Sequence, residues 1–156
     1  MRQRTLVIAG LAAVGVAVAV AVPMAILAMQ GSHELKFKYV KSGGIAGINE
    51  ELAFDSKTGV ITFFRSTLGS TEEKHLSDAK VQELRQAIAG SGFFAMDSVY
   101  QPRQGPADYF SYSLNITMDG MTHSVSWVDD FASSEPVPAG LKSIVSEIEV
   151  AYANAS

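Results

Sequence analysis

The chain of 156 residues carries a formal net charge of −4 and contains no cysteine, which excludes disulfides, thiolate nucleophiles and cysteine-based zinc sites. All 16 acidic residues but only 10 of the 12 basic residues follow position 30, so that stretch has a net charge of −6. Phosphate binding needs an excess of clustered Lys and Arg, so this balance argues against nucleic acid as a partner.

Residues 5–29 carry no charged side chain. As a helix this run would measure about 37 Å at about 1.5 Å per residue, which is longer than a hydrocarbon core of about 30 Å. A cleavable signal peptide usually has a shorter apolar stretch of about 7–15 residues, and no clean A-x-A cleavage site follows the run. We therefore expect an uncleaved transmembrane signal anchor, with a cleaved signal peptide as the alternative.

Arg2 and Arg4 precede the apolar run. Because positive residues stay on the cytoplasmic side, we expect residues 1–30 to form a cytoplasmic tip and the anchor. Residues 31–156 are then expected to form one extracytoplasmic domain of a single-pass protein of the cytoplasmic membrane.

Alternating apolar residues predict strands at residues 33–41, 48–54 and 60–64. The glycine-rich stretch at residues 42–47 is expected to end the first strand and to separate it from the second. Residues 55–59 have turn chemistry, because Gly59 can adopt a positive φ. The third strand therefore forms a hairpin-like stretch with the second.

A helix is predicted after Ser77, which is a good N-cap. Gly90 and Gly92 are expected to stop it. The apolar residues of its buried face recur at i, i+3 and i+7: Val81, Leu84 and Ile88.

The clearest pattern is a hairpin around Asp119-Gly120, a strong type I′ turn signal. Apolar residues alternate strictly with polar ones from Phe110 to Met118. A two-residue loop predicts a register in which both apolar rows share one face. The predicted partners are Met118 with Met121, Ile116 with His123, Leu114 with Val125, and Tyr112 with Trp127.

Pro136 and Pro138 are expected to open a last helix, where an early proline is tolerated. Its apolar stripe consists of Leu141, Ile144, Val145, Ile148 and Tyr152. These elements predict an α+β domain: an antiparallel sheet of four to five strands with two helices on one face, preceded by one transmembrane helix.

The sequence contains no convincing catalytic or metal-binding pattern. His33-Glu34 begins like H-E-x-x-H, but Phe37 occupies the position of the second histidine. His123 falls on the apolar face of the hairpin and is interpreted as a partly buried core histidine, and a dyad with Asp129 and Asp130 is not favoured. We therefore expect no metal, no cofactor and no enzyme activity.

The glycine cluster at residues 43–47 matches neither G-x-G-x-x-G nor a Walker loop. Two interpretations stay open. The cluster is either a tight turn or bulge, where glycine reaches dihedrals closed to other residues, or a binding loop whose exposed Ile45 and bare backbone approach a partner.

The glycine motif resembles the signature of the emfourin family, whose founding member is the protealysin inhibitor. The order and spacing of residues 108–112, of the hairpin with its return strand at 123–125, and of the final helix are also similar. The resemblance covers about residues 35–152, although the membrane anchor and the stretch at 55–66 are departures from the family. The motif positions are Ser42, Gly43, Gly44, Ile45, Ala46, Gly47 and Ile48.

The resemblance implies a cystatin-like arrangement of sheet and helix. It also implies binding to a thermolysin-like metallopeptidase, with the seven motif residues as partner-binding positions. Two functions are open at this point. One is a membrane-anchored inhibitor that blocks the peptidase cleft, and the other is a tethered envelope scaffold or ligand-binding module with no peptidase target.

Overall fold

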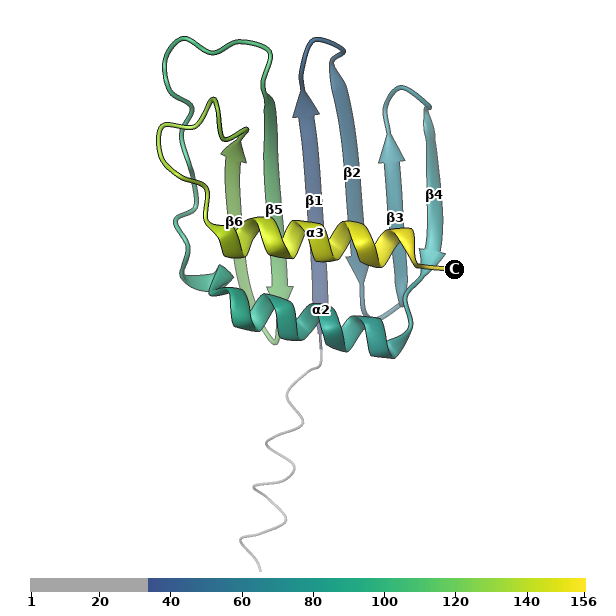
Figure 1. The fold of residues 1–156 in the computed structure, drawn as a ribbon. Helices are drawn as coiled ribbons and strands as arrows, with labels where there is room; N and C mark the ends of the chain where they lie inside the picture. The colour runs from purple at the N-terminus through teal and green to yellow at the C-terminus, as the bar shows by residue number, and fades with distance from the viewer. Residues whose placement is uncertain (1–33) are drawn as a thin grey trace, which may run out of the picture. The chain divides into compact units, whose positions relative to one another are not determined.

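The computed structural model describes residues 34–156, which form a six-stranded antiparallel sheet with two helices on one face (Figure 1). The predicted anchor at residues 5–29 lies outside the described residues. Among residues 34–156, none of the helices has the length and apolar character needed to span a bilayer. The prediction of an α+β domain with an antiparallel sheet is confirmed.

The strands are arranged in the order β4-β3-β2-β1-β5-β6, so that β1 lies in the middle of the sheet. Two α-helices and one short 3₁₀ helix complete the described chain. The bounds are β1 (Leu35–Gly43), β2 (Ile48–Asp55), β3 (Val60–Arg65), β4 (Ser70–His75), α2 (Asp78–Ser91), η1 (Phe93–Ala95), β5 (Phe110–Met118), β6 (Met121–Val128) and α3 (Ala139–Ala153).

The predicted number of four to five strands is wrong, because β4 lacks the expected apolar pattern. Its sequence is STEEKH, and none of its side chains is buried. The strand exists because its backbone pairs with β3 across a tight turn in which Gly69 has a φ of 63°. A strand whose side chains do not enter the core leaves no period-two apolar signal in the sequence.

The hairpin register is confirmed in every predicted pair. Met118 faces Met121 and Tyr112 faces Trp127, with Ile116–His123 and Leu114–Val125 between them. The turn places Asp119 at a φ of 52° and Gly120 at 83°, as a type I′ turn requires.

Several element boundaries differ from their predictions, and three of the differences are informative. The first strand is expected to end before Ser42, but β1 continues through Gly43, which is paired with both β2 and β5. Ser77 caps α2 by accepting a hydrogen bond from the Lys80 N–H, and the helix ends at a left-handed Gly92, so Gly90 lies inside it. The last helix begins at Ala139, with Pro138 as its N-cap.

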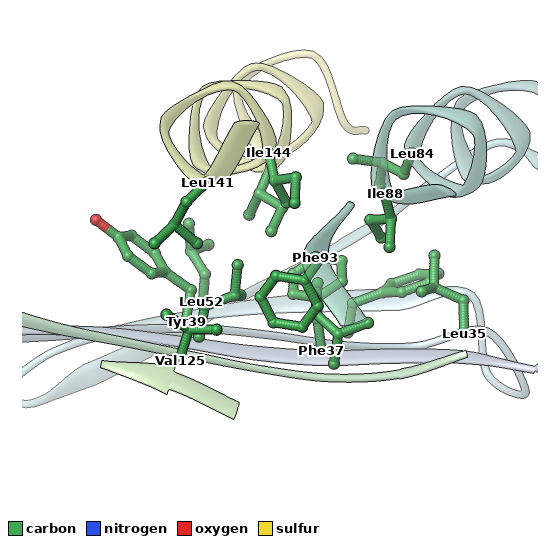
Figure 2. Packing of buried hydrophobic residues seen from close by; sticks show 14 of the residues in the cluster. Leu35, Phe37, Tyr39, Leu52, Leu84, Ile88, Phe93, Val125, Leu141 and Ile144 are labelled. Carbon is green, nitrogen blue, oxygen red and sulfur yellow. The ribbon is translucent and has the colours of Figure 1, made fainter. Parts of the chain in front are cut away.

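The core lies between the two helices and one face of the sheet (Figure 2). Phe93 from η1 is fully buried between the helices and the sheet. Alternate residues of the strands and the apolar stripes of the helices meet there, as the periods of two and 3.6 predict. The largest fully buried side chains are Phe93, Leu35, Ile61, Leu84, Ile88, Leu114, Ile116, Leu141, Ile144, Ile148 and Val125.

The two edge strands of the sheet, β6 and β4, differ in how far their outer backbone groups are hydrogen-bonded. The edge of β6 is covered by a passing segment: the Tyr100 N–H donates to the Ser126 carbonyl (2.9 Å), and the Ser126 N–H donates to the Ser98 carbonyl (2.9 Å). At the other edge, His75 is the only β4 residue that residues 34–156 pair in this way, through two hydrogen bonds with Ser156 (2.7 and 3.4 Å). The rest of β4 is polar, with Glu72, Glu73 and Lys74 charged, which is typical of an edge strand exposed to solvent.

Tyr152 joins the end of α3 to this edge. Its hydroxyl donates to a Glu72 carboxylate oxygen (2.7 Å), and its ring lies 5.3 Å from the ring of Phe63. Burial, and then the bond to Glu72, raises the pKa of Tyr152 from 10.0 to about 12.

We expect the contribution of Tyr152 to stability to disappear in alkaline solution. Because its folded-state pKa is raised, this contribution is complete below pH 10 and is lost as the pH rises through about 12. The Tyr152→Phe variant should therefore be less stable than the natural protein at pH 7, and the difference should close between pH 10 and 12. Urea unfolding of both proteins at these pH values measures the difference, and a constant gap would contradict the assignment.

Candidate functional site

Three connections gather at one end of the sheet, which we call the turn end. Since β1 and β3 run in the same direction, the β1–β2 turn and the β3–β4 turn lie at the same end. β6 also finishes there and β5 begins there (Figure 1). The chain enters β1 at the opposite end, beside the β5–β6 turn.

Each of these three connections carries a large apolar side chain in solvent. Ile45 in the β1–β2 turn is 89% exposed, Leu68 in the β3–β4 turn is 66% exposed, and Phe131 in the loop after β6 is 56% exposed. Scattered exposed apolar residues are normal on a protein surface. Three of them on connections at the same end of the sheet make this end a candidate protein-binding surface.

The β1–β2 turn requires its glycines. Gly43, Gly44 and Gly47 have φ values of 107°, 67° and 58°. A Cβ on Gly43 would lie 2.8 Å from the Tyr109 carbonyl oxygen, and one on Gly44 would lie 2.8 Å from the ring of Phe110. The tight-turn interpretation of the glycine cluster is therefore confirmed.

Hydrogen bonds fix the same turn to the start of β5. The Gly44 N–H donates to the Tyr109 carbonyl (3.1 Å), and the Gly47 N–H donates to the Gly44 carbonyl (3.1 Å). The tip is therefore held in one conformation while Ile45 stays exposed. Such preorganisation lowers the entropy cost of binding a partner.

The seven motif positions do not form one exposed loop. Ser42 and Gly43 belong to β1 and Ile48 belongs to β2. Only Ile45 and its neighbours Ala46 and Gly47 are exposed, while the others are partly buried. A direct partner-binding role of the seven motif positions therefore stays a prediction. Only the exposed residues at the tip of the turn are accessible to a partner.

Asp129 links the start of β5 to the loop that carries Phe131. One of its carboxylate oxygens accepts from the Phe110 N–H (2.8 Å), and the other accepts from the Tyr112 hydroxyl (2.7 Å). Its carbonyl accepts from the Ala132 N–H (2.8 Å), which closes the turn around Phe131. Asp129 thus positions the loop and forms no dyad with a histidine.

His123 is a core histidine, as predicted. Its Nε2 lies 2.9 Å from the Met96 carbonyl oxygen, and its ring meets Phe93 edge-on at 5.4 Å. Asp130 forms an ion pair with Lys142 (2.6 Å). Within residues 34–156, no three potential metal ligands lie together.

Sequence reasoning missed Leu68 and Phe131. Leu68 lies in the turn of a strand pair that the apolar pattern does not reveal, and Phe131 follows the hairpin in an irregular loop. A single large apolar residue between turn-forming neighbours was the only signal available for either. Their proximity to the glycine turn depends on the strand order, which local patterns do not give.

These features define the class of the protein: a small α+β domain whose rigid turns offer an apolar surface at one end of an antiparallel sheet. The emfourin family model matches residues 66–144, which is half of the chain, and the chain belongs to the emfourin family. The match includes residues 108–112 and 123–125 but begins after the glycine motif. No curated protein matches the chain.

We expect Gly43→Ala to destabilise the protein more than Gly47→Ala. Both variants place a side chain at a positive φ, but only the Cβ at position 43 meets a backbone carbonyl, while nothing lies within 4 Å at position 47. Overpacking of this kind costs about 1–3 kcal/mol. Urea unfolding should show this additional loss for Gly43→Ala, whereas equal losses would mean that the contact with Tyr109 does not constrain the turn.

Proposed function

We propose that this protein inhibits a thermolysin-like metallopeptidase and that its turn end blocks the peptidase cleft. Membership of the emfourin family supports an inhibitor that acts by binding a protein. The observation that carries the proposal is the row of exposed apolar side chains on rigid turns, Ile45, Leu68 and Phe131. No catalytic group of its own is needed for such a function.

The geometry of the β1–β2 turn is suited to resist cleavage. A peptidase acts on a segment that it can hold in an extended conformation, and three positive φ values within five residues are incompatible with that conformation. The hydrogen bonds to Tyr109 and within the turn oppose its opening. The bare glycine backbone also allows a partner to approach closely.

The three apolar side chains must act together. Burying one of them contributes about 1.5–3 kcal/mol, whereas association costs about 4–15 kcal/mol in lost freedom. A single turn therefore cannot hold a partner, while three turns reach the range in which additional backbone contacts yield tight binding. This comparison favours a surface formed by all three connections over a single binding loop.

The same proposal includes the membrane anchor at residues 5–29 and an extracytoplasmic location of the domain. β1 begins at Leu35, at the end of the sheet opposite to the turns. A strand of nine residues spans about 30 Å at about 3.3 Å per residue. The length of β1 thus separates the turn end from the point at which the chain enters the sheet.

We expect Ile45→Ser, Leu68→Ser and Phe131→Ser each to weaken inhibition of a susceptible thermolysin-like peptidase. Each variant removes the burial of one apolar side chain, about 1.5–3 kcal/mol, which is roughly ten-fold or more in the inhibition constant. Steady-state inhibition assays with the full chain in a mild detergent measure the effect.

Met121→Ser is the matched control, because Met121 is 53% exposed at the start of β6, beside the β5–β6 turn at the opposite end of the sheet. It should inhibit like the natural protein. An equal loss for Met121→Ser would show that the turn end is not the contact surface. The absence of inhibition of several such peptidases at micromolar protein would reject the inhibitor proposal and favour the tethered scaffold.

Full-length protein should fractionate with membranes and resist extraction by alkaline carbonate, because an apolar helix of about 20 residues or more spans a bilayer. An epitope at the C-terminus should be digested by protease added outside intact spheroplasts. Removal of residues 1–30 should release the domain from the membrane. Recovery of the full-length chain in the cytosol would contradict the anchor.

A further inference from the structure

A groove runs between α3 and the half of the sheet nearest the turn end. It consists of two neighbouring cavities of about 310 and 230 Å³ that share Tyr39 and Glu149. We call it the Tyr39 groove. Its position beside Asp129 brings it close to the loop of Phe131, so a partner at the turn end would also meet its mouth.

The floor of the groove is a stack of three aromatic rings. Tyr112 lies 5.3 Å from Trp127 and 6.4 Å from Tyr39, measured between ring centroids, and the rings are nearly parallel. Tyr39 and Trp127 are also stacked, at 6.2 Å.

The Tyr39 hydroxyl has an unused hydrogen-bonding capacity. Tyr39 is only 6% exposed, and its oxygen has no hydrogen-bond partner within residues 34–156. No enclosed side-chain nitrogen or oxygen of the described chain lacks a partner, so this oxygen opens into the groove. Figure 2 shows the Tyr39 hydroxyl directed to the left, beside Leu141 and away from the other labelled side chains.

Most charges around the groove are already neutralised. Arg65 pairs with Glu50 (2.7 Å), Lys142 pairs with Asp130 (2.6 Å), and Glu51 pairs with Lys38 (2.8 Å). Each of these pairs leaves no net charge for a ligand.

Two carboxylates and one ammonium group are left over. The Lys41 ammonium group lies 4.5 Å from the centre of the Phe110 ring. The Asp129 carboxylate accepts a hydrogen bond from the Phe110 N–H at the start of β5. Glu149 has no ion-pair partner within the described residues and belongs to both cavities. Burial, and then the charge of Glu149, raises the pKa of Tyr39, which agrees with a carboxylate close to this hydroxyl.

We propose that the Tyr39 groove binds the protonated amine or guanidinium group of a Lys or Arg side chain of the protein that the turn end contacts. The Tyr39 hydroxyl accepts a hydrogen bond from the cation, and the Glu149 carboxylate supplies the opposite charge. Each of the two cavities, of about 310 and 230 Å³, has room for the end of one long side chain. That this side chain belongs to the bound peptidase rests on the proposed function. The preference of the groove for a cation does not depend on it.

The test uses Nα-acetyl-lysine methylamide as the probe and Nα-acetyl-norleucine methylamide, which has the same four-carbon chain without the ammonium group, as its neutral control. Trp127 is the only tryptophan of the chain, so its indole N–H signal in a ¹⁵N-labelled spectrum reports on the groove alone. With the full chain in neutral detergent micelles, we expect a saturable shift with the lysine compound in the millimolar range and none with the norleucine compound.

Glu149→Gln and Tyr39→Phe should each weaken binding of the lysine compound about ten-fold, the equivalent of about 1.4 kcal/mol. Glu147→Gln is the matched control, because Glu147 is an exposed acid on the same helix that lines neither cavity. Equal shifts with both compounds, no shift with the lysine compound, or the same loss in Glu147→Gln would each overturn the proposal. Because this measurement contains no peptidase, its result is independent of the inhibition assays.

Discussion

The pairing of β1 with both β2 and β5 is the constraint on which the rest of the structure depends. All nine residues of β1 are paired with β5, and eight of them are paired with β2. Because a one-residue slip would turn Leu35, Phe37 and Tyr39 away from the helices, the core fixes this register. The same register brings the β1–β2 turn beside the start of β5, where Tyr109 and Phe110 hold the glycines.

The turn end is therefore a product of the core and not an appended feature. Asp129 continues the connection from β5 to the loop of Phe131, while the pairing of β2 with β3 places Leu68 at the same end. An apolar surface on such connections gains affinity because little of it needs to be ordered on binding. This arrangement agrees with membership of the emfourin family and with the inhibitor that we propose.

Local patterns predicted the elements whose residues meet the core and failed where tertiary contacts decide. The β5–β6 hairpin was correct to the register, because alternation and an Asp-Gly turn specify both its face and its loop. β4 was missed because its side chains are in solvent, and Leu68 was missed with it. The glycine motif indicated a tight turn, but its contact with Tyr109 could not be foreseen. The groove at Tyr39 joins segments more than one hundred residues apart and has no local signal.

The acidic edge of the sheet has a consequence for crowded conditions. If two copies met edge to edge in a centred antiparallel arrangement, Glu72 of one β4 would stand opposite Glu73 of the other. Like charges directly across a strand pair are destabilising, so the open edge opposes its own extension into a continuous sheet. The strand can thus stay uncovered at high protein concentration without drawing copies of this chain together.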